Sequence, residues 1–270
     1  MDNYEDRIVL FLDILGFKRI VNDTMQKEKE VFEKTRYLIE TINEMIKIAE
    51  LAPRETSRNV TQFSDSIVIS FKQNDIKEIP KLFYNLQRLI SYLLSRDILC
   101  RGAVSYGKLY HKDNLIFGPA LVDAYETESQ AALYPRVILD KSVVDVMKDH
   151  YVFKREHFIR RIRFDAEVES YLKTDTDDKF YIDYFTGSMI FLKNEELFRV
   201  YKNLRKLIIN GLRYKNPNIN IKYGWMKNKY NKLPDELKRI NEVEELFMDR
   251  KDIEQFIKDF NPIKTTANSK

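Results

Sequence analysis

The feature that most constrains the fold is an apolar run near the N-terminus. Residues 7–15, RIVLFLDIL, are rich in β-formers and end directly at Gly16. From about 18 to 51, apolar residues recur instead at the spacing of one helix face. This change of period at a glycine predicts a strand, a sharp turn and a helix, and it places Asp13 near the end of the strand.

The next segment predicts a β-hairpin. Residues 59–71, NVTQFSDSIVISF, contain two β-rich halves separated by Ser64 and Asp65. Small polar residues of this kind occupy tight hairpin turns, so Asp65 is expected at or beside a hairpin tip. A second helical pattern comes next, over about 76–96, with its apolar residues on one face.

The segment from about 98 to 148 completes one sheet. Residues 98–111 and 114–118 are predicted strands, and a proline opens a predicted helix of roughly 119–133. Residues 136–139 predict another strand, and 141–148 a short helix. The order strand, helix, strand, strand, helix, strand is that of a split ferredoxin-like sheet with helices packed on one face. The predicted fold class is therefore α+β with an antiparallel-rich sheet.

The C-terminal part of the chain predicts a hairpin and then helices. The hairpin falls over 171–185, YLKTDTDDKFYIDYF, with the acidic middle as its turn. Two later segments have helical spacing, and Asn216 and Pro217 separate the first of them from the rest of the chain. We therefore expect one domain over residues 1–185 and a helical C-terminal extension over 186–270.

Composition and charge argue against several classes of protein. The chain has 46 basic and 42 acidic residues, a net charge of +4, and the two signs are interspersed, which makes nucleic-acid binding an unlikely main role. The single cysteine cannot form an intrachain disulfide, and the first residues lack the pattern of a secretory signal. No stretch approaches the roughly 20 apolar residues of a membrane-spanning helix. We expect a cytoplasmic protein without a membrane span.

Asp13 and Asp65 are the candidate metal ligands. In a split ferredoxin-like sheet the first strand lies near the strand after the first helix, so the two carboxylates can converge. Hard divalent cations prefer oxygen ligands, and two ions about 4 Å apart lower the pKa of an attacking hydroxyl and neutralise the leaving oxygens. Gly16 and the helix N-terminus after it favour phosphate. Each acid also has a structural explanation, Asp13 as a helix cap and Asp65 as a turn residue.

The ordered motifs resemble a known family. FLDILGF, residues 11–17, is similar to the metal-binding opening of class III adenylate and guanylate cyclases, and TQFSDSIVISF is similar to their second metal-binding hairpin. CRGAVSYGKLYHKDNLIFGPALVDAY and PRVILDKSVVDVMK resemble the segments that come next, and LKTDTDDKFYIDY resembles the late strand pair that carries a phosphate-binding lysine. The likeness covers about residues 7–185, with the motifs in the family's order.

Within this family, GPALVDAYETES followed by YPRVIL resembles the bacterial Pycsar-type pyrimidine cyclases, which defend bacteria against phage. The resemblance implies that UTP or CTP is converted to cyclic UMP or cyclic CMP with release of pyrophosphate. It also implies an effector protein that the product activates. A head-to-tail homodimer with sites at the subunit interface is implied as well.

The resemblance assigns roles to individual residues. Asp13 and Asp65 match the metal carboxylates, and the carbonyl of Ile14 is a further ligand, for two Mn²⁺ or Mg²⁺ ions. The positions that match nucleotide-binding residues are Leu15, Gly16, Phe17, Arg101 and Lys173. Arg101 matches a phosphate contact, which its forked donors suit, although an arginine in an ion pair is the alternative. Lys173 either meets the terminal phosphate or is solvated.

Three positions depart from the family's pattern. Thr61 stands where purine enzymes have a base-contacting lysine. Val122 and Glu126 stand where the family has the asparagine and arginine that position the ribose and stabilise the pentavalent phosphate. Two explanations stay open. Either the pocket is rebuilt for a pyrimidine, with Thr61 or Gln62 reading its edge, or the domain is a catalytically silent nucleotide-binding or signalling scaffold.

Other chemical groups have plainer explanations. The three histidines lie in charged or polar surroundings without a zinc motif and are expected on the surface: His111, His150 and His157. Cys100 lies in an apolar strand and is expected to be a buried structural thiol. A basic cluster with aromatic neighbours over 154–163 is either a solvated face or a site for phosphate or nucleic acid. Tyr223, Trp225 and Tyr230 are expected to pack inside the extension.

Overall fold

The computed structural model describes residues 3–25, 28–50, 57–153, 171–192, 194–243 and 251–264. The chain divides into two compact units. Unit 1 comprises Met1–Leu93 and Ile98–Asp183, and unit 2 comprises Leu94–Asp97 and Tyr184–Lys270. The assignment of residues 1–185 to one domain and of 186–270 to an extension stays a prediction.

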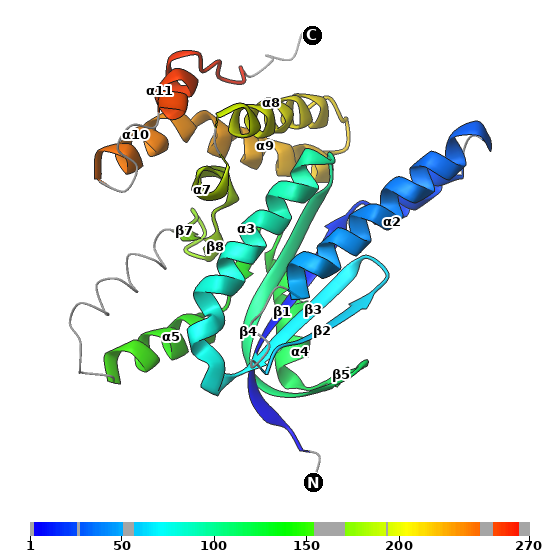
Figure 1. Cartoon of the computed structure of the whole chain (residues 1–270), viewed down its shortest axis with the longest axis vertical. Coiled ribbons are helices and arrows are strands. Elements are labelled where there is room, and N and C mark those ends of the chain that lie inside the picture. Colours follow the sequence, from blue (N-terminus) through cyan, green and yellow to red (C-terminus); the bar gives the residue numbers. More distant parts are fainter. Residues whose placement is uncertain are drawn as a thin grey trace. The chain divides into compact units, whose positions relative to one another are not determined.

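Unit 1 is an α+β unit, as predicted (Figure 1). Its helices flank one mostly antiparallel sheet. In chain order the elements are β1 (Glu5–Leu15), α1 (Phe17–Thr24), α2 (Glu28–Glu50), β2 (Asn59–Phe63), β3 (Ser66–Lys72), the 3₁₀ helix η1 (Gln73–Glu78), α3 (Ile79–Ser95), β4 (Leu99–Lys112), β5 (Leu115–Phe117), α4 (Pro119–Glu126), the π-helical turn η2 (Thr127–Ala131), β6 (Val137–Leu139), α5 (Lys141–Phe153), β7 (Leu172–Thr174) and β8 (Phe180–Ile182).

The sheet places β1 in its interior. The strand order is β2-β3-β1-β4-β6-β8-β7, with β5 paired to β4, and of these pairs β4 with β6 is parallel. β1 therefore has a hydrogen-bonded neighbour on each side, and its residues from Ile8 to Leu12 are at most 5% exposed. A strand covered on both faces needs a continuous apolar run rather than alternation, which explains the sequence of residues 7–15.

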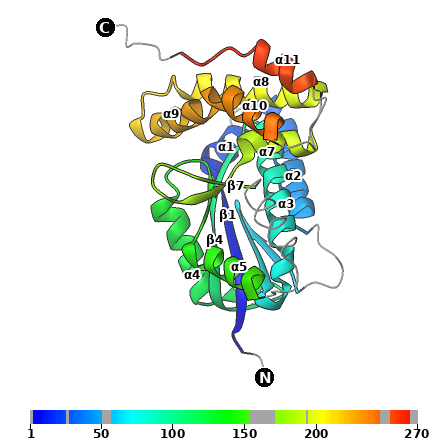
Figure 2. The same cartoon turned by 90° about the vertical axis from the view of Figure 1, so that its left-hand side faces the viewer.

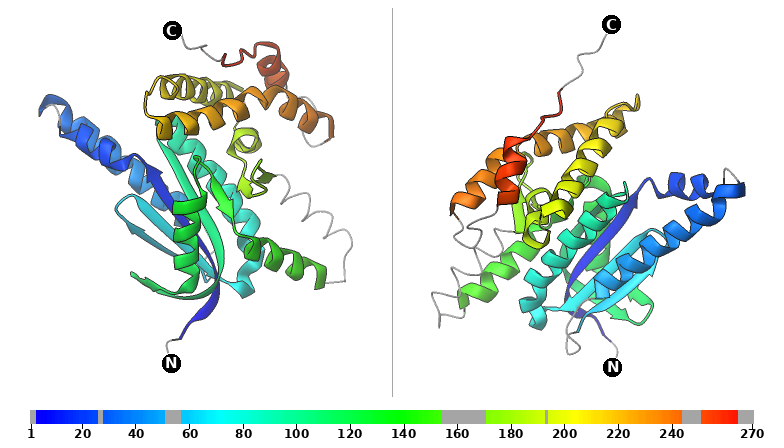
Figure 3. Two further views of the ribbon diagram at one scale, coloured as in Figure 1. Left: turned by 180° about the vertical axis from the view of Figure 1, so that it is seen from behind. Right: turned by 45° about the horizontal axis from the view of Figure 1, so that its top comes forward.

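Helices cover both faces of the sheet rather than one. α2 and α3 lie on one face and α4 on the other, as the front and back views show (Figures 1 and 3). On the α4 face, Ala120 and Ala124 are fully buried against Val9 and Phe11 of β1. Two alanines one helical turn apart let the helix approach the sheet closely. The predicted packing on a single face is therefore wrong in this respect.

Arg136 fastens the turn between β7 and β8. Its side chain is fully buried and forms ion pairs with Asp175 and Asp177. The Asp175 amide donates to the carbonyl of Lys179 at 3.0 Å, which closes the turn. The predicted hairpin with an acidic turn is thus confirmed, and the acidic residues serve to hold a buried guanidinium.

Unit 2 is helical and has its own core. Its elements are α7 (Tyr184–Phe191), α8 (Asn194–Gly211), α9 (Pro217–Asn231), α10 (Leu233–Val243) and α11 (Lys251–Lys258). α8 and α9 lie side by side (Figure 2). Trp225 and Tyr230 are buried, as predicted for the extension. The Tyr201 hydroxyl donates to the carbonyl of Phe185 at 2.9 Å, which ties α8 to α7.

Three sequence-based boundaries are wrong. The helix predicted over 18–51 is two helices, because α1 ends at Thr24 and α2 begins at Glu28. The strand predicted to reach Phe185 ends at Ile182, and α7 comes after it. α7 is apolar on all sides, so helical periodicity gives no signal there. Asn216 and Pro217 open α9, with the Asn216 side chain capping the helix, rather than ending one.

In the part of the chain that the structure describes, none of the helices has the length and apolar character needed to cross a membrane. The basic cluster over 154–163 lies outside the described residues. The side chains of His150 and His157 lie outside them as well.

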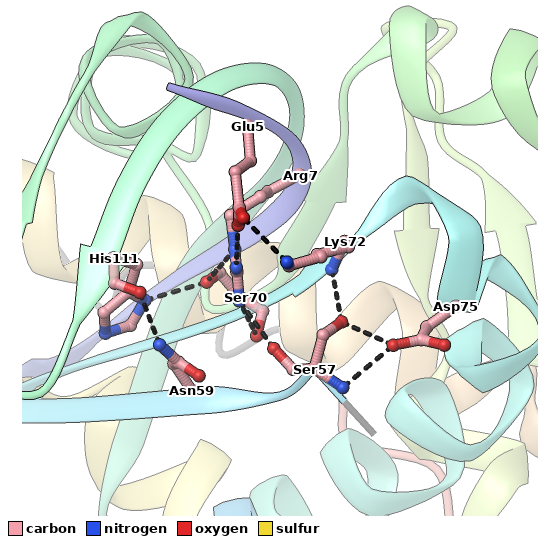
Figure 4. A network of polar contacts seen from close by, with 8 residues as sticks. All are labelled: Glu5, Arg7, Ser57, Asn59, Ser70, Lys72, Asp75 and His111. Atoms are coloured by element: carbon pink, nitrogen blue, oxygen red, sulfur yellow. Dashed lines mark hydrogen bonds and ion pairs between the residues drawn. The ribbon is translucent and has the colours of Figure 1, made fainter. Parts of the chain in front are cut away.

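A polar network lies on the α4 face, toward the N-terminal end of β1. Its members are Glu5, Arg7, Ser57, Asn59, Ser70, Lys72, Asp75 and His111 (Figure 4). Arg7 is 2% exposed, and its guanidinium donates to the Ser70 hydroxyl at 2.9 Å and to the Glu5 carboxylate at 2.7 Å. Lys72 pairs with the same carboxylate at 2.7 Å. The buried charge of Arg7 is thereby compensated within the network.

His111 is buried, so its predicted place on the surface is wrong. Its Nδ1 lies 2.8 Å from the Ser70 hydroxyl, and its Nε2 lies 2.8 Å from the Thr61 hydroxyl. Because the Thr61 hydroxyl donates to the carbonyl of Asp113, Nε2 is assigned as the donor and Nδ1 as the acceptor of a neutral ring. Burial and the charge of Arg7 lower the pKa of His111 to about 4.

The pKa of His111 predicts loss of stability in mild acid. The unfolded chain takes up a proton near pH 6.5, whereas the folded ring stays neutral down to about pH 4, so protonation favours unfolding between these values. We expect the free energy of unfolding to fall by an amount on the order of 2 kcal/mol from pH 6.5 to about pH 4.5. Urea unfolding across this range should show a smaller slope for His111→Gln, and equal slopes would contradict the assignment.

Candidate functional site

Asp13 stands at the C-terminal end of the central strand. In the two ladders of β1 it lies directly opposite Ser66 of β3 and Arg101 of β4. Residues opposite each other in antiparallel strands point to the same face, so all three side chains lie on the α4 face of the sheet. The Asp13 carboxylate is partly buried, and the Ser66 hydroxyl donates to it at 3.1 Å.

Asp65 lies at the hairpin tip, as predicted. β2 ends at Phe63 and β3 begins at Ser66, which leaves Ser64 and Asp65 as the turn. Ser64 has a φ of 55°, a left-handed conformation that tight hairpin turns require. The amide of Ile14 donates to the carbonyl of Asp65 at 3.2 Å. This bond joins the hairpin tip to the end of β1 and brings the two predicted metal ligands to one place.

The electrostatics of the pair favour a bound cation. Burial and the neighbouring charge of Asp65 raise the pKa of Asp13, although the hydrogen bond from Ser66 and the charge of Arg101 act in the opposite direction. Two carboxylates that disfavour each other's ionisation form an environment that a divalent cation relieves. Among the described residues, groups of three or more histidine, cysteine or acidic side chains suited to a metal are absent. The protein's charged ligands to such a cation would therefore be Asp13 and Asp65.

Gly16 opens the backbone beside this pair. It has a φ of 76° and precedes α1, and the space where a side chain would stand is open. Its carbonyl accepts the amides of Arg19 and Ile20, so the preceding amides of the first turn, at Phe17 and Lys18, point out of the helix end. α1 has no acidic residue in its first turn. These amides and the helix dipole favour an anion next to the acidic pair.

Arg101 lies beside Asp13 and is paired. Its side chain is 24% exposed, and its Nε forms an ion pair with Glu128, which is 3% exposed. The predicted phosphate contact and the predicted ion pair are thus both compatible with its position. Cys100, the preceding residue, is buried as predicted, and burial together with the charge of Asp13 raises the pKa of its thiol to about 12.

Lys173 is not brought to this end of β1. It lies on β7, the edge strand, and β4, β6 and β8 stand between it and β1. Its amine forms an ion pair at 2.8 Å with the buried carboxylate of Asp183, and the side chain is 22% exposed. A freely solvated lysine is therefore not what the structure contains at this position.

The candidate base-reading residues differ in their surroundings. Thr61 is buried, and its hydroxyl is bonded to His111 and to the carbonyl of Asp113. Gln62 is partly exposed, and its amide donates to the carbonyl of Ser64. On α4, Val122 and Glu126 are both exposed. Their contacts with ribose or phosphate stay predictions.

Sequence reasoning missed two residues of this site. Ser66, the hydroxyl donor to Asp13, is the last residue of the SDS turn that drew attention to Asp65. Glu128 is the buried partner of Arg101. It comes after Ala120 and Ala124 at intervals of four residues, so a glutamate continuing a buried alanine stripe was the signal available in the sequence.

Comparisons with known proteins find likeness at the level of structure. No protein-family model matches the chain, and no curated protein matches it. Similar solved structures include the adenylyl cyclase CyaB from P. aeruginosa, at 18% identity and a TM-score of 0.38, covering 54% of this chain and 82% of that one. A bacterial light-regulated adenylyl cyclase has 15% identity and a TM-score of 0.42, covering 76% and 98%.

An adenylate/guanylate cyclase/hydrolase from Silicibacter pomeroyi has 14% identity and a TM-score of 0.39, covering 67% of this chain and 98% of that one. At these identities and TM-scores the likeness carries no argument about family or reaction. The functional interpretation therefore depends on the site itself.

The raised pKa of Asp13 predicts a cost in stability that a cation removes. The protonated form contributes stability that is lost as pH rises through the folded pKa, so Asp13→Asn should stabilise the metal-free protein at neutral pH. We expect its unfolding midpoint in EDTA to rise by about 2–4 °C, the shift of about 1 kcal/mol. Added Mn²⁺ should raise the midpoint of the unmodified chain and leave that of Asp13→Asn unchanged.

Asp145→Asn is the matched control for this measurement. Asp145 is exposed on α5, so its loss removes one carboxylate without touching the pair. Its Mn²⁺ response should equal that of the unmodified chain. A full Mn²⁺ shift in Asp13→Asn would show that Asp13 is not a ligand.

Proposed function

We propose that the chain is a divalent-metal-dependent nucleotidyl cyclase with its site at the C-terminal end of β1. The observation that carries the proposal is the meeting of Asp13 and Asp65 at the strand end, joined by the bond from Ile14 to the hairpin tip. Gly16 and the first turn of α1 add amides beside the acidic pair. Acidic ligands next to an anion-binding helix end suit a metal–triphosphate complex.

The residues of the site divide the work between the metal and the phosphates. Asp13, Asp65 and the carbonyl of Ile14 would hold Mn²⁺ or Mg²⁺. When two such ions are bound, they lower the pKa of the ribose 3′-hydroxyl and neutralise charge on the leaving pyrophosphate. The main chain from Leu15 to Phe17 faces the triphosphate, and Arg101 donates to its oxygens. These groups orient the 3′-hydroxyl in line with the α-phosphate.

A pyrimidine nucleotide is the proposed substrate. The motif resemblance points to UTP or CTP, with cyclic UMP or cyclic CMP as a second messenger that activates an effector protein in the cytoplasm during antiphage defence. The Thr61 hydroxyl is already bonded within the protein, so Gln62 is the better candidate to read the base edge. A threonine and a glutamine in place of a purine-contacting lysine fit a smaller base.

A homodimer is part of the proposal. Phe63, Val122 and Tyr125 are 45–55% exposed, and Phe63 and Tyr125 both contact Phe11, which lies on the same face as Asp13. Exposed aromatic residues grouped around a site mark an interaction surface. In a head-to-tail dimer the partner could supply groups, such as a lysine, that unit 1 does not bring to Asp13.

A silent nucleotide-binding scaffold is the second candidate. The observation that favours it is the exposed pair Val122 and Glu126 on α4, where the related cyclases have an amide and a guanidinium. Neither side chain can donate a hydrogen bond to ribose or to phosphate at neutral pH. A scaffold would bind the metal–nucleotide complex without releasing pyrophosphate.

Turnover with Mn²⁺ and each of the four nucleoside triphosphates tests the proposal. We expect a cyclic pyrimidine monophosphate and pyrophosphate, detected by chromatography, and at least a roughly 100-fold loss of rate in Asp65→Ala, since a ligand to the ions is removed. Asp145→Ala, on exposed α5, should retain full rate.

The outcomes separate the two candidates. Absence of product from all four nucleotides with an intact dimer would overturn the cyclase. Metal-dependent nucleotide binding in calorimetry without product would then establish the scaffold. Product formation that requires Asp65 would exclude the scaffold.

A further inference from the structure

The ion pair between Arg101 and Glu128 is the feature of the site that the proposed mechanism does not use. Arg101 lies opposite Asp13 in the ladder between β1 and β4, and its Nε pairs with the Glu128 carboxylate. The Glu128 side chain is 3% exposed. A buried carboxylate is costly unless a cation compensates it, so its position next to Asp13 calls for an explanation.

The fold places Glu128 there through α4. Ala120, Ala124 and Glu128 succeed one another at intervals of four residues, and all three are buried. The two alanines pack against β1, and the stripe continues toward the end of the sheet that carries Asp13. The π-helical turn η2 contains Glu128 and is closed by a bond of 3.1 Å from the amide of Ala132 to the carbonyl of Thr127. Such turns inside helices are frequent at functional sites.

The chemistry of the pair leaves the working end of the guanidinium available. An arginine side chain has five N–H donors, of which one is on Nε and four are on the two terminal nitrogens. The ion pair engages Nε. The terminal fork is the part that binds two phosphate oxygens at once, and it does so well only when the guanidinium plane is fixed.

We propose that Glu128 is a positioning residue that holds Arg101 by its Nε edge, so that the terminal nitrogens bind the polyphosphate of the nucleotide beside Asp13. The inference rests on the proposed function for the identity of the ligand. Glu128 acts through Arg101 and does not touch the substrate. The neutrality of the pair also means that Arg101 contributes directed hydrogen bonds rather than net charge.

Two other roles for Glu128 predict the opposite result. If Glu128 masked Arg101, or if the carboxylate acted only through its charge, Glu128→Gln would make the site more positive and tighten the binding of a polyanion. If Glu128 positions Arg101, the same change weakens binding, because an unheld side chain loses conformational freedom on binding. The sign of the change therefore decides between them.

Titration with inorganic tripolyphosphate and Mg²⁺ tests the inference without requiring turnover. We expect Glu128→Gln to weaken binding about tenfold, the effect of one charge-assisted hydrogen bond. Arg101→Ala should weaken it at least as much, and the double variant no more than Arg101→Ala alone, because both changes remove one contact. Glu126→Gln is the matched control, since it removes an exposed carboxylate from the same helix and should leave binding unchanged.

Circular dichroism and thermal unfolding establish that each variant is folded. If Glu128→Gln does not fold, Glu128→Asp keeps the buried charge with a shorter reach, and we expect an intermediate loss of tripolyphosphate affinity. With a turned-over nucleotide, the loss should appear in KM rather than in kcat.

Failure of the inference differs from failure of the cyclase. Non-additive loss of tripolyphosphate binding without any cyclic product would uphold the positioning role and overturn the cyclase. Unchanged or tighter binding in Glu128→Gln, additive losses in the double variant, or no binding by the unmodified chain would overturn the positioning role.

Discussion

The burial of β1 between two hydrogen-bonded neighbours is the constraint on which the site depends. Both ladders reach Asp13, so Ser66 and Arg101 flank it on the same face, and the bond from Ile14 to Asp65 adds the hairpin tip. The same burial withdraws water from Asp13 and sets it beside a like charge, which raises its pKa. A rigid strand end thus holds two acids in an arrangement that is unfavourable until a cation binds.

The parts of this site that depend on local sequence could be predicted. The change from an apolar run to helical spacing at Gly16 marks the end of β1, and small polar residues at Ser64 and Asp65 mark the turn. These signals are short-range, because turn geometry and strand burial act on adjacent residues. The convergence of Asp13 and Asp65 then results from the order of the elements, since neighbouring strands of one sheet bring their ends together.

The parts that were missed depend on contacts between distant elements. His111 is polar and lies in a strand that also contains two lysines, yet the curl of β4 carries it onto Ser70 and Thr61, where it becomes buried. Its burial also takes the Thr61 hydroxyl away from a role in reading the base. α7 was missed for a different reason, since an apolar segment without a polar face has no period to detect. Only the packed structure decides such cases.

The charges of the described side chains around Asp13 imply an order of events. Arg101 and Glu128 cancel each other, and the pair therefore leaves the two carboxylates of Asp13 and Asp65 to set the local charge. A polyphosphate meeting that charge alone is repelled, whereas a divalent cation is attracted. Once the cation is bound, the amides at Gly16 and the fork of Arg101 offer hydrogen bonds to phosphate without adding net positive charge. Selectivity for a metal–nucleotide complex over free polyanions results from this neutrality, because directed donors reward only a ligand that arrives with its own countercharge.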